Sequence, residues 1–353
     1  MMLNFLTIVL ISLGLLTAPT DTRRENTPDD EKIHHSDETQ LQNIRQLTSG
    51  GRNAEAYFSF DGKSLIFQST REPFECDQIM RMNLDGSNQV LISTGKGRTT
   101  CAYFLPGDKK ILYASTHLHG DNCPPPPDRS KGYVWGVFSS YDLIIANADG
   151  TNPKPLFASP GYDAEATVSP KGDKIVFTST RDGDLDLYTM NIDGSNAKRI
   201  TSDIGYDGGA FYSWDGKKIV YRAHHPTDPE EIKEYKELLS RQLVKPTAME
   251  IFVIDADGKN RKQLTSNGAA NFAPFFHPDN QRIIFSSNVE RGGRQFDLFI
   301  MNIDGSNLKR ITRLGDFNSF PMFSKDGKKL VFVSDRNAKG SYEYNIFIAE
   351  WVD

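Results

Sequence analysis

The stretch SPKGDKIVFTSTRDGDLDLYTMNIDGSNAKRIT, residues 169–201, contains the pattern that decides the fold. Its turn residues, Pro-Lys-Gly-Asp and Asp-Gly, alternate with short segments that are rich in Ile, Val, Phe and Tyr. Segments of this length and composition, bounded by Gly, Pro and Asp, predict β-strands that are joined by tight turns. With the three residues before it, the stretch predicts four strands, at 166–169, 174–179, 185–191 and 198–201.

The same turn-and-strand pattern recurs six times along the chain. Its aligned aromatic residues are Phe67, Tyr113, Phe177, Tyr221, Phe285 and Phe332. The intervals between them are 46, 64, 44, 64 and 47 residues, which gives a unit of about 45 residues and two insertions of nearly 20. Four antiparallel strands at a period of 40 to 50 residues describe a blade of a β-propeller. The sequence therefore predicts an all-β fold, a six-bladed propeller of four-stranded blades.

The two ends of the repeat region predict how the ring closes. The sixth copy provides only three strands before the sequence reaches Asp353. The segment NIRQLTS, at 43–49, resembles the fourth-strand segments KRITS at 198–202 and KQLTS at 262–266. We therefore expect this N-terminal strand to complete the last blade, which leaves no unpaired edge there and makes 43–353 one domain.

Two near-identical segments, MNIDGSNAKRIT at 190–201 and MNIDGSNLKRIT at 301–312, have two alternative interpretations. Their Asp, Asn and Ser oxygens could bind a cation, whereas Asp-Gly between apolar strands is a strong hairpin signal. An EF-type cation loop needs an acidic residue at its twelfth position, and counting from Asn191 that position is Ser202. We therefore interpret these segments as hairpin turns at the outer edge of the blades.

The repeat units resemble the TolB-like (PD40) repeats, whose pattern S-P-D-G-K-x-I-x-F-x-S-x-R is followed by an apolar strand, x-D-G and L-T. Residues 169–181 and 186–201 follow this pattern closely, and the resemblance covers about 43–353. It implies a propeller and a partner-binding role in the cell envelope. The same repeats also occur in propellers of hydrolases and carbohydrate-active enzymes, which implies an enzymatic alternative.

The N-terminal region predicts export. An apolar run at 5–16 is too short to span a bilayer and has the length of a signal-peptide core. We expect a signal peptide at 1–20, a disordered polar tether at 21–42 and a periplasmic or secreted protein. Membrane contact is expected only if the signal segment stays uncleaved.

The charge argues against nucleic-acid binding, and the cysteine content indicates a disulfide. The formal net charge is -5, with both signs interspersed, so the chain has no basic stripe for nucleic acid. The three cysteines are Cys76, Cys101 and Cys123. In an oxidising compartment one pair is expected to form a disulfide, and the sequence leaves all three pairings open.

The two insertions, at about 117–140 and 224–248, both fall between the second and third strands of a blade, so we expect them on one face of the propeller. The first is rich in proline and aromatic residues. The second predicts a helix that begins at Thr227 or Asp228. One face of that helix carries Ile232, Tyr235, Leu239 and Leu243. We expect this helix to lie across the channel mouth as a lid or partner surface.

Candidate ligand or partner contacts lie in the first insertion and just before the innermost strands. They are Glu55, Trp135, Tyr162, Asp163, Glu165, Tyr206 and Asp207. The expected partner is an envelope protein or a small ligand that binds this insertion-bearing face.

The alternative is a hydrolase or lyase that acts on carbohydrate or peptide with a His and carboxylate site. Its candidate ligands for a divalent metal are His117, His119, His224 and Glu165. A structural interpretation competes with it, because His117 and His225 occupy the slot that holds Arg in other repeats. The sequence contains no G-x-S-x-G, H-E-x-x-H or phosphate-loop motif. No cofactor is predicted apart from that metal.

Overall fold

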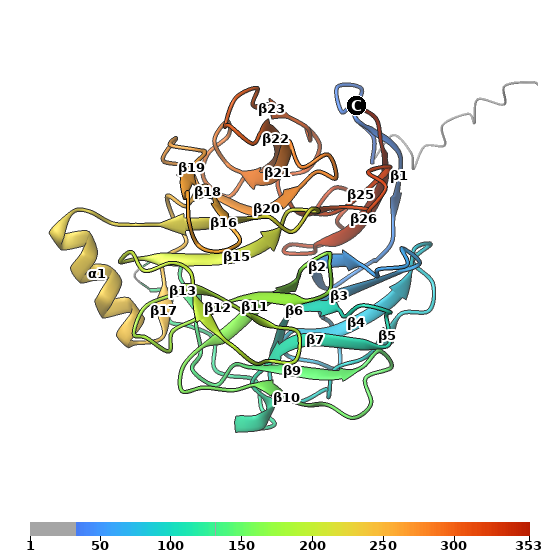
Figure 1. Ribbon diagram of the computed structural model, residues 1–353. Coiled ribbons are helices and arrows are strands. Elements are labelled where there is room, and N and C mark those ends of the chain that lie inside the picture. The colour runs from blue at the N-terminus through green and yellow to red at the C-terminus, as the bar shows by residue number, and fades with distance from the viewer. Residues whose placement is uncertain (1–32, 131) are drawn as a thin grey trace, which may run out of the picture.

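The computed structural model describes residues 33–353 apart from residue 131, and the predicted signal peptide lies outside these residues. Six four-stranded antiparallel sheets surround a central axis, so the six-bladed propeller is confirmed (Figure 1). The first strand of each blade is innermost, since these strands contact one another around the ring.

Blades one to three follow the chain from inner to outer strand. Blade one contains β2 (Arg52–Phe58), β3 (Ser64–Thr70), β4 (Gln78–Asn83) and β5 (Val90–Leu91). Blade two contains β6 (Thr99–Phe104), β7 (Lys110–Ser115), β9 (Asp142–Asn147) and β10 (Lys154–Phe157). Blade three contains β11 (Asp163–Val168), β12 (Lys174–Ser179), β13 (Asp186–Asn191) and β14 (Lys198–Arg199).

Blades four to six repeat this order. Blade four contains β15 (Tyr206–Tyr212), β16 (Lys218–His224), β18 (Glu250–Asp255) and β19 (Lys262–Gln263). Blade five contains β20 (Asn271–Phe276), β21 (Arg282–Ser287), β22 (Asp297–Asn302) and β23 (Lys309–Arg310). Blade six contains β24 (Asn318–Phe323), β25 (Lys329–Ser334), β26 (Asn345–Trp351) and β1 (Leu41–Gln46).

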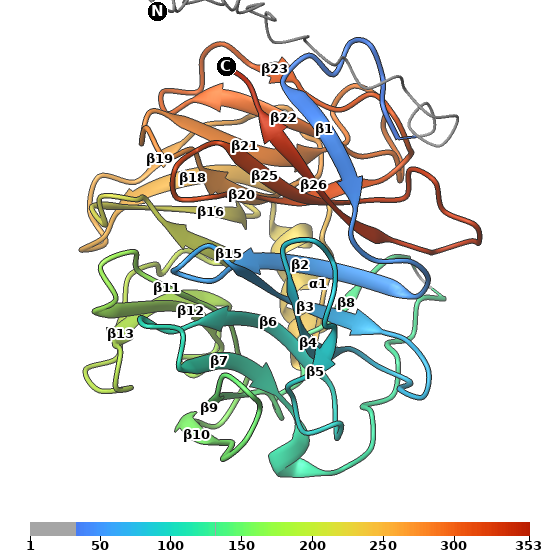
Figure 2. The same ribbon diagram turned by 90° about the vertical axis from the view of Figure 1, so that its right-hand side faces the viewer.

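The closure of the ring agrees with the sequence prediction. The N-terminal strand β1 pairs with β26 in antiparallel register, with Leu41 opposite Trp351 and Gln46 opposite Phe347. Figure 2 shows the blue β1 beside the red β26. The two ends of the propeller domain are thus joined within one sheet, and the outer edge of the last three strands is covered.

The last ten residues of the predicted tether, 33–42, are folded, which corrects the expectation for that part. Glu38 is 2% exposed, and its carboxylate forms an ion pair of 2.9 Å with the guanidinium of Arg336. The same carboxylate accepts hydrogen bonds from the backbone amides of Arg313 and Leu314, at 2.6 and 3.1 Å. The polar composition predicted disorder, but one buried carboxylate anchors the segment to blades five and six.

The NIDGSN segments are hairpin turns, as predicted. Between β13 and β14, the Asp193 carboxylate accepts hydrogen bonds from the Ser195 amide at 3.0 Å and hydroxyl at 2.6 Å. Gly194 and Asn196 have φ values of 86° and 56°, in the left-handed region that Gly and Asn tolerate best. The carboxylate oxygens therefore stabilise the turn itself.

The core continues into the channel. Aromatic residues of the innermost strands meet across it, with ring centroids 5.5 Å apart for Tyr57 and Phe211 and 5.1 Å apart for Phe211 and Phe275. Tyr57 belongs to blade one and Phe211 to blade four, so these rings close the channel on the side away from the insertions. Access from the insertion-bearing face therefore ends at this aromatic layer.

The two insertions lie on one face and join there. The first contains the 3-10 turn η1 (His117–His119) and β8 (Trp135–Gly136), and the second contains α1 (Pro229–Ser240) and β17 (Leu243–Val244). Strands β8 and β17 pair in antiparallel register. Figures 1 and 2 together place α1 beyond one end of the innermost strands and close to the propeller axis.

The helix begins as predicted. Asp228 caps α1 by accepting hydrogen bonds from the amides of Glu230 and Glu231. Its buried side chain is Tyr235, whose hydroxyl donates to Gly205 O at 2.7 Å and to the carboxylate of Asp184. These bonds attach α1 to the loop between blades three and four. No helix in the described part of the chain is long and apolar enough to cross a membrane.

Candidate functional site

A β-bulge occurs at the same place in every innermost strand and forms the base of the site. The register of each pair of first and second strands shifts there. At each shift one residue has a φ between 49° and 59°, and these residues are Glu55, Cys101, Glu165, Gly209, Ala273 and Phe320. A bulge bends the strand and re-aims its side chains. Glu55 and Glu165 were predicted to precede these strands, whereas they lie inside β2 and β11.

Glu165 is the centre of a hydrogen-bonded network between blades three and four. Its carboxylate forms an ion pair with Arg222 of β16 and accepts hydrogen bonds from the Tyr206 hydroxyl at 2.9 and 3.1 Å. The Thr178 hydroxyl and the Gly209 amide also donate to it, at 2.9 and 3.1 Å. With four donor groups around its two oxygens, this carboxylate is a satisfied structural anion.

The Gly-Gly pair at 208–209 makes this network possible. A methyl group on Gly208 would overlap the Tyr206 hydroxyl and the Glu165 carboxylate. A methyl group on Gly209, where φ is 59°, would overlap the Arg222 guanidinium. The two glycines therefore provide the space through which Arg222 reaches Glu165.

Trp135 of the first insertion covers this network. Its ring lies 5.2 Å from the guanidinium carbon of Arg222, within cation–π distance. It also lies 6.4 Å from the Tyr206 ring and 6.2 Å from the Phe272 ring of blade five. One residue of blade two thus connects blades four and five across the mouth.

Glu55 is an acid of the site whose pKa is raised. One of its carboxylate oxygens has no solvent contact and no hydrogen-bond partner in the described structure. The pKa of Glu55 is raised from 4.5 to about 7, and burial is the largest cause. The negative charge of Glu165 also raises this pKa, whereas a hydrogen bond to Cys101 lowers it. Cys101 is the free cysteine, and burial raises the pKa of its thiol well above the usual value. A carboxyl group that titrates near neutrality is suited to proton transfer.

Asp163 and Asp207 have no exposed surface, and each is held by a residue one or two positions after the second strand of its blade. Arg181 donates to Asp163 at 2.9 Å, and Nε2 of His225 lies 3.0 Å from Oδ1 of Asp207. Burial alone lowers the pKa of His225, but the hydrogen bond and charge of Asp207 raise it above the usual value. The same contact joins Arg71 to Asn53 and Arg336 to Asn318. The contacts of Asp163 and Asp207 therefore belong to a structural contact that several blades repeat.

Tyr162 and Tyr206 are also buried, at 7% and 2% exposure. Tyr162 packs edge-on against Tyr141, with ring centroids 5.7 Å apart. Of the predicted ligand contacts, Trp135, Glu165 and Tyr206 lie together. Glu55 interacts electrostatically with Glu165.

The four predicted metal ligands are not brought together. His117 Nδ1 lies 2.7 Å from the Ser115 hydroxyl, and His119 pairs with Asp142 at 2.9 Å. His224 Nδ1 lies 3.2 Å from a backbone carbonyl oxygen. The Glu165 carboxylate is already bound by Arg222 and Tyr206. Within residues 33–130 and 132–353, no group of three or more His, Cys, Asp or Glu side chains is arranged to hold a metal ion.

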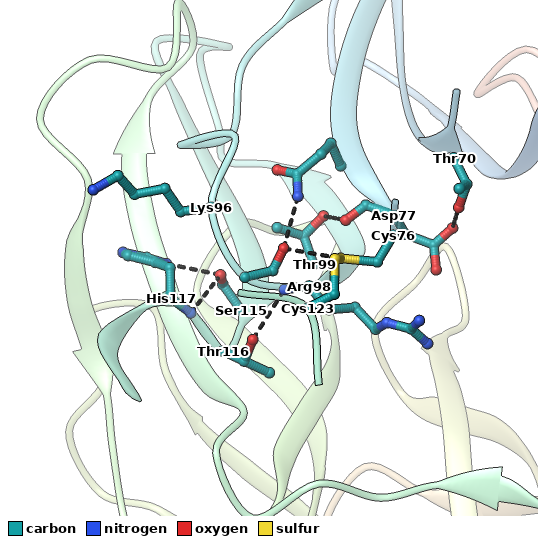
Figure 3. The surroundings of a disulfide bond; sticks show 12 residues. Thr70, Cys76, Asp77, Lys96, Arg98, Thr99, Ser115, Thr116, His117 and Cys123 are labelled. Atoms are coloured by element: carbon teal, nitrogen blue, oxygen red, sulfur yellow. Dashed lines mark hydrogen bonds between the residues drawn. A yellow bond between two sulfur atoms is a disulfide. The ribbon is translucent and has the colours of Figure 1, made fainter. Parts of the chain in front are cut away.

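A cleft of about 540 Å³ lies between blade one and the proline run of the first insertion. Its wall includes Pro124, Pro125, Pro126 and Pro127, and the disulfide between Cys76 and Cys123 fixes that wall to blade one. The S–S distance is 2.07 Å. Figure 3 shows this disulfide with Asp77 and Arg98 beside it.

Sequence reasoning missed two parts of the site. The charged lining of the cleft, Arg52, Glu75, Asp77, Arg98 and Arg129, is scattered over four segments and belongs to no motif. The sequence does distinguish Arg222, because it is charged and its equivalents in the other five repeats are not. These equivalents are Gln68, Ala114, Thr178, Ser286 and Val333. A charge that stands alone among uncharged repeat equivalents indicates a local function.

These features define a class of protein, a β-propeller whose paired insertions cover one end of its channel. The family model described as the TolB beta propeller domain (PD40) matches residues 137–237 and 236–348. The chain therefore belongs to the TolB-like propeller family.

Solved structures with the same fold include TolB proteins and an enzyme. A putative TolB from Agrobacterium tumefaciens is 17% identical, with a TM-score of 0.59, over 88% of this chain and 97% of that one. TolB from Acinetobacter baumannii is 17% identical with a TM-score of 0.56, over 86% of this chain and 65% of that one. An oligogalacturonate lyase in complex with manganese is 13% identical with a TM-score of 0.52, over 88% and 93%. At these identities the likeness concerns the fold. No curated protein matches the sequence.

Proposed function

We propose that the protein is an exported binding module of the cell envelope that engages a protein or small ligand through its insertion-bearing face. The observation that carries this proposal is the pairing of β8 with β17, which joins insertions from blades two and four into one continuous cover. Such a cover adds nothing to ring closure, which β1 and β26 already provide. Binding residues are often carried by loops that a rigid scaffold positions, and the two insertions are such loops at the channel mouth.

The composition of this face supports binding. Tyr133 and Tyr342 are 50% and 64% exposed, and arginines accompany both rings. The guanidinium of Arg129 lies 4.9 Å from the Tyr133 ring, and Arg294 donates to the Tyr342 hydroxyl at 3.2 Å. Tyr and Arg are enriched at the energetic centres of protein interfaces because they combine large contact area with directed hydrogen bonds.

Affinity capture with matched variants tests this proposal. Immobilised protein is incubated with envelope extract, and wild type is compared with a Tyr133→Ala, Tyr342→Ala double variant. The control is Leu308→Ala, since Leu308 is 47% exposed but lies in an outer blade turn. We expect the double variant to lose the captured species and the control to retain it. Equal capture by all three proteins would contradict the proposal.

The proposed periplasmic or secreted location has its own support and test. A disulfide persists in oxidising compartments, and the pair Cys76–Cys123 meets disulfide geometry. Cell fractionation with N-terminal sequencing of the mature protein checks this. Recovery from the cytoplasm with an intact N-terminus would refute export.

The alternative function, a hydrolase or lyase, is favoured by one observation, the elevated pKa of Glu55. An acid of pKa near 7 at the mouth of a channel is suited to general acid–base catalysis. Turnover of oligosaccharide or peptide substrates by wild type, and its loss in Glu55→Gln, would favour the enzyme. Binding without turnover would favour the binding module.

A further inference from the structure

We propose that the cleft between blade one and the proline run of the first insertion binds a small ligand that carries an oxyanion, either a carboxylate or a phosphate, and hydroxyl groups. This inference rests on the proposed binding function of the insertion-bearing face and names the class of ligand. The cleft of about 540 Å³ has the size of small-molecule sites in proteins.

The oxyanion is inferred from three arginines that line the cleft, Arg52, Arg98 and Arg129. Neither Arg52 nor Arg98 forms a side-chain hydrogen bond or ion pair with any residue that the structure describes. Nε of Arg98 has no solvent contact either, so it is a buried donor without a partner among the residues that the structure describes. An unsatisfied buried donor costs free energy, and a ligand acceptor in the cleft would remove that cost. The planar guanidinium fork fits carboxylate and phosphate oxygens in pairs.

The hydroxyl groups are inferred from the two acids of the same lining. Asp77 accepts a hydrogen bond from the Thr70 hydroxyl at 2.5 Å through one oxygen, and Glu75 is exposed. Their remaining lone pairs accept hydrogen bonds from a ligand but repel a second anionic group. The cleft therefore favours a ligand with one anionic end and neutral donors.

The walls of the cleft are preorganised. The disulfide holds Cys123 against blade one, and Cys76 at the other end of the bridge is itself buried, at 1% exposure. Four consecutive prolines, 124–127, follow directly, and proline fixes φ near −65°. A wall that is already rigid loses little conformational entropy when a ligand binds.

Three hexoses that differ only at carbon 6 test the inference, namely D-glucuronate, glucose 6-phosphate and glucose. Binding is measured by titration calorimetry at physiological salt on wild type, Arg98→Met and Arg241→Met. Arg241 is an exposed arginine at the end of α1, outside the cleft lining. We expect at least one charged sugar to bind ten times or more tightly than glucose. Arg98→Met should weaken that binding about tenfold, whereas Arg241→Met should not change it.

Each outcome decides the inference. If the phosphate binds and the carboxylate does not, or the reverse, the oxyanion is identified. If all three sugars bind alike, or if the two variants behave alike, the inference is wrong. Should Arg98→Met fail to fold, Arg52→Met probes the same cleft from an exposed side chain. If the Tyr133→Ala, Tyr342→Ala double variant loses the captured species but wild type binds neither charged sugar, only this inference is refuted. The proposed binding function of the insertion-bearing face would then stand.

Discussion

Replacing Glu55 by Gln should remove a pH-dependent loss of stability. The pKa of Glu55 is raised from 4.5 to about 7, first of all by burial. The folded protein therefore holds this proton more tightly than the unfolded chain does. Its contribution to stability is complete below about pH 4.5 and is lost as the pH rises toward 7. Each tenfold change in proton affinity corresponds to 1.36 kcal/mol, so the full loss is about 3 kcal/mol.

The assay is urea unfolding at pH 5 and pH 8. Wild type should lose about 2 to 3 kcal/mol through this group between the two pH values, because the unfolded chain is already partly ionised at pH 5. Glu55→Gln imitates the protonated acid, so the variant should lack this loss and be the more stable protein at pH 8. The control, Glu237→Gln, changes an exposed residue of α1 and should follow wild type.

The reasoning would be refuted by parallel pH profiles of wild type and Glu55→Gln. That result would mean that Glu55 titrates near its ordinary pKa, with water reaching the carboxylate oxygen that has no partner in the described structure. It would also remove the observation that favours an enzymatic alternative.

Three further predictions concern stability. Glu38→Ala leaves the buried Arg336 without its counter-ion and should cost about 3 to 5 kcal/mol in urea unfolding, and a loss below about 1 kcal/mol would contradict this. Reduction of the Cys76–Cys123 disulfide should cost about 2 to 4 kcal/mol, measured as the shift of the urea midpoint by dithiothreitol. Gly209→Ala introduces both a positive-φ penalty and a clash, so it should cost at least about 2 kcal/mol, whereas an unchanged unfolding midpoint would refute the steric argument.

The blade count and the ring closure could be predicted because they depend on local signals that repeat. Each blade contains at least one Asp-Gly turn, and turn residues act over four positions of sequence. The beginnings of strands were less predictable. The first strand of blade three was expected at 166–169 but is β11, at Asp163–Val168. None of its residues is exposed and its register shifts between Ala164 and Thr167, so it lacks the alternation of buried and exposed residues that would mark where it begins.

The folding of residues 33–42 could not be predicted for a different reason. Composition measures how much apolar surface a segment can bury by itself. It does not show that Arg336, almost 300 residues away, lies buried and needs an anion. Pairing that guanidinium with Glu38, together with the burial of Ile33 and Leu41, offsets the cost of ordering the segment.

The repeats explain why the residues of the candidate site were only partly predictable from the sequence. In a propeller, a polar residue at a position shared by all blades is explained by the blade itself, as the contact of Asp163 with Arg181 illustrates. A residue that departs from its repeat equivalents has no such explanation. Arg222 is such a departure, and Gly208 and Gly209 are the further departures that give it room. The function of this chain is therefore to be sought where blade four differs from its neighbours and where the insertion of blade two, through Trp135, covers that difference.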